Sequence, residues 1–156
     1  MLNGFGRSEV RIDLSNQTVM KKPLNPQFAR EWLGGRGFIC KILYDEVPRH
    51  VQAFDPENPV VISPGVLSGH FAPSGSKCCF GAISPISNGH GDSTVGGHFG
   101  PELKFAGIDL LIIKGKAQGP SYIFIDDDRI EIRDASKYWG KGSLDAEKML
   151  KEDLGE

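Results

Sequence analysis

The sequence predicts an α+β fold: layered, mixed or antiparallel β-sheets built from hairpins, with a few helices inserted singly. Three observations predict it. Two pairs of strand-like segments, within residues 4–22 and 122–133, are separated only by turn residues, which is typical of hairpins. The strands do not alternate regularly with helices, as a doubly wound sheet requires. A length of 156 residues is typical of a single domain, here residues 1–156.

The N-terminal segment predicts the first hairpin. Val10, Ile12 and Leu14 alternate with charged residues, so residues 4–14 are expected to form a strand with one apolar face. A turn follows, and residues 18–22 are expected to return as the antiparallel partner.

Two helices are expected next. Asn25 can accept hydrogen bonds from free N–H groups and proline suits the first helical position, so a helix is predicted from Asn25-Pro26 to Gly34-Gly35. A second helix is predicted at about residues 37–46, with Cys40 as a small apolar filler. The buried face of the first helix is expected to consist of Phe28, Trp32 and Leu33.

The remaining elements are short. Strands are predicted at residues 60–62, 78–83, 108–114, 122–126 and 129–133, with a helix at 101–106. Ser143 is expected to cap a last helix, and residues 88–92 are expected to form a loop that exposes His90. The apolar side of the last helix is expected to consist of Leu144, Met149, Leu150 and Leu154.

The composition excludes several classes of protein. A net charge of -2 with interspersed acids and bases argues against a nucleic-acid surface. No apolar run approaches the roughly 18 residues that cross a bilayer, and the N-terminus lacks the apolar core of a signal peptide. Three cysteines without framework spacing favour a reducing cytoplasm over secretion. We therefore expect a cytoplasmic protein without nucleic-acid or membrane partners.

Residues 63–107 carry the chemistry. They hold ten of the 20 glycines, and such a stretch costs conformational entropy to order. Gly96-Gly97, followed by Gly100-Pro101 at a helix start, would gather free N–H groups that favour an anion such as phosphate. The alternative is a tight turn into a packed helix. Arg36, between glycines, and Lys77, after the turn at residues 72–76, are further anion ligands or ordinary surface residues.

No catalytic centre is evident in the sequence. We find no Walker-type loop, no HExxH motif and no Ser/His/Asp or Cys/His arrangement. Adjacent Cys78 and Cys79 would point to opposite faces of a strand, so the pair is unsuited to one metal ion. We expect no catalytic residue in this chain.

Several motifs, in this order and spacing, resemble the N-terminal domain of tungsten-containing aldehyde ferredoxin oxidoreductases over nearly the whole chain. The most specific are residues 96–107 (GGHFGPELKFAG) and 130–136 (IEIRDAS). The others are Gly6-Arg7, Trp32-Leu33-Gly34-Gly35-Arg36-Gly37, Asp55-Pro56-Glu57-Asn58, Pro64-Gly65-Val66-Leu67-Ser68-Gly69, Ala72-Pro73-Ser74-Gly75, Ser84-Pro85 and Trp139-Gly140.

The resemblance implies a ligand and a reaction. In that family the domain is the base for a tungstopterin, in which two pyranopterin dithiolenes chelate the metal and their phosphates share Mg²⁺. The enzymes oxidise aldehydes to carboxylic acids and pass electrons through a [4Fe–4S] cluster to ferredoxin. The dithiolene sulfurs are soft ligands that suit tungsten or molybdenum, so the protein need not supply cysteines to that metal. The family's cluster cysteines lie in later domains, so this chain is not expected to ligate the cluster.

The family's site carries over to five positions. Gly96 and Gly97 match glycines near the pterin phosphates. Lys77 stands where the family typically has arginine, which keeps the charge but loses the two-pronged grip. Thr94 stands where the archetype has asparagine, and its main-chain carbonyl would face magnesium. Arg36 is implied as a neighbour of the pterin.

The chain would hold about half of a cofactor cradle. We therefore expect it to be inactive alone and to need remaining domains or a partner subunit, with ferredoxin as the partner of the full enzyme and a homo-oligomer as a further possibility. Two alternatives stay open. One is a non-catalytic binding or scaffold subunit that keeps the fold without the cofactor. The other is a nucleotide- or flavin-phosphate binder that uses residues 96–100.

Overall fold

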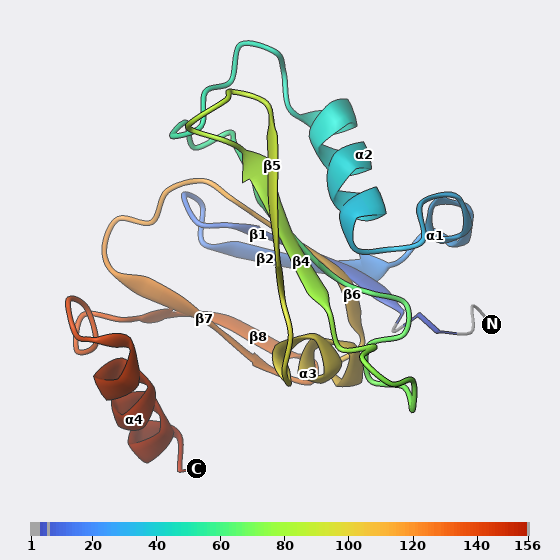
Figure 1. Cartoon of the computed structure of the whole chain (residues 1–156). Coiled ribbons are helices and arrows are strands. Elements are labelled where there is room, and N and C mark those ends of the chain that lie inside the picture. The colour runs from blue at the N-terminus through green and yellow to red at the C-terminus, as the bar shows by residue number, and fades with distance from the viewer. Residues whose placement is uncertain (1–3, 6, 156) are drawn as a thin grey trace.

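The computed structural model describes residues 4, 5 and 7–155, and it contains a mixed six-stranded sheet and a separate two-stranded sheet (Figure 1). Gly6, which falls in the predicted first strand, lies outside the described residues. The elements are β1 (Ser8–Asp13), β2 (Thr18–Pro23), α1 (Pro26–Trp32), α2 (Arg36–Glu46), β3 (Val60–Pro64), β4 (Cys78–Ile83), β5 (His90–Val95), α3 (Phe99–Phe105), β6 (Ile108–Lys114), β7 (Ser121–Asp126), β8 (Arg129–Asp134) and α4 (Ser143–Leu154).

The large sheet has the strand order β2-β1-β6-β3-β4-β5. Only the β1–β6 pair is parallel among its described ladders, while hairpin and neighbouring strands pair antiparallel. The β7–β8 hairpin forms the small sheet, with Ile123 opposite Ile132. The predicted fold class, hairpin-built mixed sheets with helices inserted singly, is confirmed.

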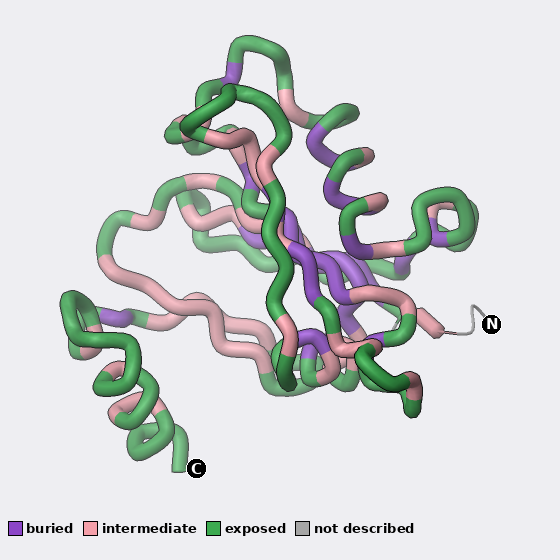
Figure 2. The backbone as a smooth tube through the Cα atoms, in the orientation of Figure 1, coloured by how far each residue is buried: buried purple, intermediate pink, exposed green. Residues whose placement is uncertain are grey.

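Apolar side chains pack on both faces of the large sheet. On one face, α1 and α2 contribute Ala29, Phe38 and Ile39 to a cluster that includes Cys79. On the other face, Leu103 of α3 packs with Cys78, and the apolar side of the β7–β8 hairpin closes that cluster. Figure 2 shows the buried segments concentrated in the central strands and on the sheet-facing side of α2. Cys78 and Cys79 thus lie in two different cores. If only one face of the sheet were covered, only one of these cysteines would be buried.

The end of α1 differs from the prediction. Trp32 and Leu33 are exposed instead of buried, with relative exposures of 36% and 64%. The helix ends at Trp32 because Leu33 takes the left-handed conformation with φ 58°. A Cβ on Gly37 would overlap the Trp32 carbonyl oxygen, so the start of α2 lies directly against this end of α1. Cys40 of α2 is also exposed and is not an apolar filler.

Three further boundaries differ from expectation. Helix α3 begins at Phe99, before the predicted start at Pro101. Gly142 precedes α4 and makes no side-chain cap, so Ser143 is the first helical residue and does not cap the helix. Residues 90–92, expected to belong to a loop, are part of strand β5.

Helix α4 buries no residue within the described chain, and Leu144 is 80% exposed. Asp153 joins it to the segment after β8 by accepting hydrogen bonds from Lys137 Nζ and Tyr138 Oη. Polar contacts therefore help to hold α4. Of its expected apolar side, Met149 and Leu150 are half-buried, while Leu144 and Leu154 are exposed. None of the helices within residues 4–155 combines the length and the hydropathy needed to span a bilayer.

Candidate functional site

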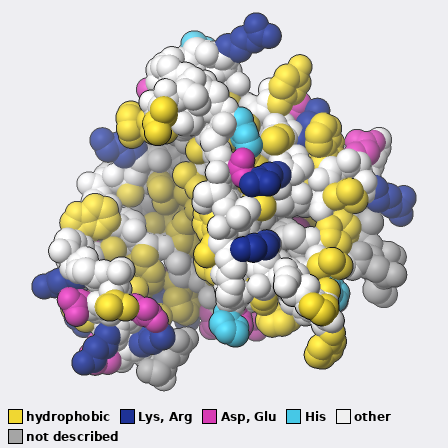
Figure 3. Space-filling view, in the orientation of Figure 1, with side chains coloured by type: hydrophobic (Ala, Val, Ile, Leu, Met, Phe, Trp, Pro, Cys, Tyr) yellow, Lys and Arg dark blue, Asp and Glu magenta, His cyan; other side chains and the backbone are white. Residues whose placement is uncertain are grey.

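Strand β5, at one edge of the large sheet, carries the predicted site residue Thr94 and leads directly into Gly96 and Gly97. Its partner is β4, with Thr94 opposite Cys79 and Asp92 opposite Gly81. Because paired residues share a face and Cys79 packs in the α2 core, Thr94 and Asp92 lie on the α2 side of the sheet. Figure 3 shows histidine, acidic and basic side chains gathered over this strand near the centre of the view.

The glycine turn after β5 is open. Gly97 has φ +81°, and an added Cβ would meet no heavy atom within 4 Å. The backbone N–H groups of Gly97 and His98 donate no hydrogen bond to any described residue. Gly100 is different, because a Cβ there would lie 3.1 Å from the Ser76 carbonyl oxygen. Gly100 thus serves packing, and the turn at Gly97 leaves main-chain donors available, while the anion-binding interpretation stays a prediction.

Lys77 lies beside this turn. Its Nζ is 3.7 Å from the position that a Cβ on Gly96 would take, and its side chain is exposed. The main chain below it is fixed, because the Lys77 carbonyl accepts hydrogen bonds from Gly65 N and from Ser68 Oγ. Ser68 is 1% exposed and also donates to the Gly75 carbonyl. Lys77 and the glycine turn thus form one cationic surface with main-chain donors. Sequence reasoning placed Ser68 in a motif but assigned it no role.

Arg36 is the first residue of α2, and a buried serine positions it. Ser63 Oγ accepts a hydrogen bond from Gly35 N and donates one to the Asp109 carbonyl, which ties the preceding turn to the sheet. Arg36 Nε then donates to Asp92 Oδ2 at 2.5 Å. This hydrogen bond raises the pKa of the Arg36 guanidinium. The predicted anion ligand is therefore paired with a carboxylate of its own chain, while its side chain remains 64% exposed.

A thiol and an imidazole meet next to Asp92. Cys40 Sγ lies 3.7 Å from His90 Nε2, and His90 Nδ1 lies 4.0 Å from Asp92 Oδ1. The sequence analysis found no Cys/His arrangement, and that conclusion was wrong. Cys40 and His90 are 50 residues apart in the sequence, and they meet because β5 packs against α2. The one feature of the sequence that could have indicated this contact is His90, which lies between Gly89 and Gly91.

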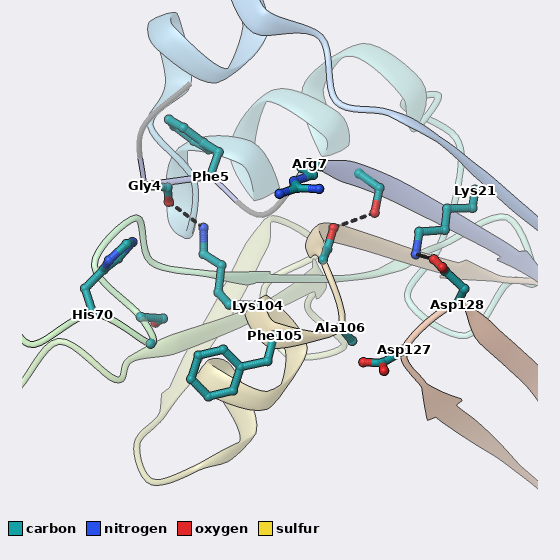
Figure 4. A pocket seen from close by; sticks show the side chains of 14 residues that line it. Gly4, Phe5, Arg7, Lys21, His70, Lys104, Phe105, Ala106, Asp127 and Asp128 are labelled. Carbon is teal, nitrogen blue, oxygen red and sulfur yellow. Dashed lines mark hydrogen bonds and ion pairs between the residues drawn. The ribbon is translucent and has the colours of Figure 1, made fainter. Parts of the chain in front are cut away.

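The largest described cavity lies elsewhere. It has a volume of about 670 Å³ and is lined by the N-terminal segment, α3, the residue 68–70 loop and the β7–β8 turn (Figure 4). None of Arg36, Lys77, Thr94, Gly96 and Gly97 lines it. Within the described residues, no three His, Cys, Asp or Glu side chains are placed to hold a metal ion.

The geometry defines a class of domain: an α+β base that carries an open glycine turn and a lysine on one face. Its five predicted site residues fall into two groups on that face. Lys77, Gly96 and Gly97 lie together, and Thr94 is two residues before Gly96 on β5. Arg36 is separate, in its pair with Asp92.

Comparisons with known proteins agree with this class. The sequence model of the family described as "Aldehyde ferredoxin oxidoreductase, N-terminal domain" matches residues 9–156. The chain therefore belongs to that family, and the resemblance inferred from the sequence motifs is confirmed. A tungsten-containing aldehyde ferredoxin oxidoreductase of Pyrococcus horikoshii is 42% identical over 153 residues, which cover 98% of this chain and 25% of the relative.

Other relatives are oxidoreductases with different stated substrates. An "Aliphatic sulfonate oxidoreductase, WOR-like subunit" of Pyrococcus furiosus is 38% identical over 93% of this chain and 23% of its own length. Among solved structures, the active-site complex BamBC of benzoyl coenzyme A reductase matches with a TM-score of 0.96 and 34% identity, covering 99% of this chain and 24% of that one. The chain spans about a quarter of the length of these relatives.

Proposed function

We propose that the chain is the N-terminal domain, residues 1–156, of a tungsten or molybdenum bis-pterin aldehyde:ferredoxin oxidoreductase. Its role is to hold one side of the cofactor, while the remaining domains or a partner subunit supply the [4Fe–4S] cluster and the residues that act on the aldehyde. Ferredoxin would accept the electrons. The single observation that supports this role is the open turn at Gly97, whose main-chain N–H and that of His98 have no described acceptor.

The residues present fit a phosphorylated cofactor. Two adjacent main-chain N–H groups beside an ammonium group form the donor set that binds phosphate oxygens. Glycine at residue 97 leaves room, since an added Cβ would project into space that a ligand can use. Gly96, Gly97 and Lys77 would hold the phosphates, and the main-chain carbonyl of Thr94 would face Mg²⁺, which prefers oxygen ligands.

The protein's own contribution is positioning. A bound tungstopterin would supply the two-electron redox chemistry that converts an aldehyde and water to a carboxylic acid. Lys77 offsets phosphate charge, and Ser68 holds the main chain that carries Lys77 in place. Arg36 would contact the pterin only through guanidinium N–H groups other than its Nε, because Asp92 accepts from Nε. This pairing leaves less net charge at Arg36 than a free arginine would offer.

A second candidate is a scaffold subunit that keeps the fold without the cofactor. The Arg36–Asp92 pair favours it, because an internal carboxylate already occupies one predicted anion ligand. The two candidates differ in whether the glycine turn binds phosphate. A nucleotide or flavin binder would use the same turn, but no further feature of the site supports a base or ribose contact.

Amide chemical shifts of the isotopically labelled chain test the proposal during titration with inorganic phosphate and Mg²⁺. The proposal predicts saturable shifts at Gly97 and His98 and weaker binding by about tenfold or more in Lys77→Ala, since a charge-assisted hydrogen bond contributes roughly 1.5–3 kcal/mol. Lys141→Gln is the matched control, because Lys141 is exposed and distant in sequence from the turn. Shifts spread evenly over surface lysines, or unchanged at Gly97, would favour the scaffold subunit.

A further inference from the structure

The three thiols of the chain lie in different environments. Cys78 and Cys79 are buried in the two cores of the sheet, and burial raises the pKa of the Cys78 thiol to about 12 and also raises that of Cys79. Cys40 is exposed on α2. Buried thiols are inert because they neither ionise nor meet reagents, so only Cys40 is accessible to chemistry in solution.

Cys40 has a base within reach. His90 Nε2 lies 3.7 Å from Cys40 Sγ, a distance at which the thiol can donate its proton to a neutral imidazole. The other ring nitrogen, Nδ1, faces Asp92 Oδ1 at 4.0 Å. A carboxylate on that side favours a proton on Nδ1, which leaves Nε2 as the acceptor. The described constellation is therefore a nucleophile, a base and an orienting group.

The surroundings keep this constellation in place. His90 and Asp92 are two residues apart on β5 and share its α2-facing side. Asp92 is fixed by Arg36 of α2, and Arg36 also interacts electrostatically with Cys40. Arg36 and Asp92 are thus two charged groups next to the Cys40–His90 pair. The Cys40–His90 and Arg36–Asp92 contacts together link α2 to the edge strand β5. These contacts limit the rotation of the Cys40 and His90 side chains.

We propose that Cys40 is a thiol modification site, activated by His90, that forms mixed disulfides with low-molecular-weight disulfides. The Cys40 thiol gives its proton to His90 Nε2, and its sulfur attacks one sulfur of the reagent. The reagent's S–S bond breaks as the new S–S bond forms. The departing thiolate takes the proton from His90 and leaves as a thiol, so Cys40 is oxidised and the reagent is reduced.

Reaction of the folded chain with 4,4′-dithiodipyridine tests the proposal, because this uncharged disulfide releases a coloured product for each thiol that reacts. We expect one fast-reacting thiol per chain at neutral pH, and none in Cys40→Ser. His90→Gln, which keeps a polar side chain but offers no comparable base, is expected to slow the fast reaction by about tenfold or more. That ratio should approach one at high pH, where hydroxide ionises the thiol in both proteins.

His50→Gln is the matched control, since His50 is an exposed loop histidine and should leave the rate unchanged. A misfolded variant is recognised because Cys78 and Cys79 would then react as well. Equal rates for the wild-type chain and a folded His90→Gln variant would overturn the proposal. So would mass-spectrometric assignment of the fast adduct to Cys78 or Cys79.

Discussion

Removal of the Lys104 ammonium group is expected to destabilise the domain strongly. The side chains of Lys104 and Asp109 are only 6% and 1% exposed, and Lys104 Nζ lies 2.5 Å from Asp109 Oδ1. Lys104 Nζ also donates to the Gly4 carbonyl at 2.8 Å, as Figure 4 shows from inside the cavity, and Asp109 Oδ2 accepts from Arg7 N. The pair joins α3, β6 and the N-terminal segment below the glycine turn.

Lys104→Met keeps much of the side-chain volume but withdraws the positive charge that faces a buried carboxylate. Breaking such a pair costs about 3–5 kcal/mol, a large share of the roughly 5–15 kcal/mol that stabilises a domain. For a chain of this size the melting temperature should fall by roughly 6–20 °C. Lys148→Met, at a position where the lysine side chain is 78% exposed, should change it little.

Thermal and denaturant unfolding, followed by circular dichroism, measure both variants. The double variant Lys104→Met/Asp109→Leu should lose less than the sum of the single losses, because it no longer buries a charge. A loss under about 1 kcal/mol for Lys104→Met would show that the pair contributes no more than a surface ion pair, and the reasoning would fail.

Two further perturbations follow from the geometry. In Gly37→Ala the new Cβ would clash with the Trp32 carbonyl oxygen, so we expect a loss of at least about 2 kcal/mol by denaturant titration, whereas Gly119→Ala, with open space around it, should stay within about 0.5 kcal/mol. The hydrogen bond to Asp153 raises the pKa of Tyr138 to about 12. Because this folded-state pKa lies above the usual value of about 10, the contact stabilises the fold below that pH and is lost as pH rises through about 12. In a pH titration followed by tyrosinate absorbance, the tyrosine that ionises at the highest pH should do so at a lower pH in Asp153→Asn. An unchanged ionisation pH would contradict the contact.

Local patterns predicted the hairpins and the buried strands well. Alternation along β1 and the apolar run in β6 each correspond to a strand that the structure contains. Strand β5 was missed because its sequence, HGDSTV, has little strand propensity and is exposed except at Gly91. Its extended conformation depends on pairing with β4, which is a long-range interaction that a local pattern does not carry.

The same limit applies to the candidate site. Motifs placed the glycines, Lys77 and Thr94 within 21 residues of one another, and the structure brings Lys77 beside Gly96, while their role in binding stays a prediction. The partner of Arg36 could not be predicted, since Asp92 is 56 residues away in the sequence. The exposed end of α1 was also beyond prediction, because helical periodicity does not reveal that Gly37 brings α2 against the Trp32 carbonyl. Sequence motifs thus nominate candidate site residues, and tertiary contacts decide which of them are already paired.

The central claim is that the glycine turn and Lys77 hold a phosphorylated metal cofactor. Tungsten, molybdenum and pterin content of the full-length protein, purified as wild type, Lys77→Ala and Lys141→Gln, tests it most directly. We predict that Lys77→Ala loses metal and pterin together while it remains folded, and that Lys141→Gln retains wild-type content. Full metal and pterin content in Lys77→Ala, or none in the wild-type protein, would contradict the account.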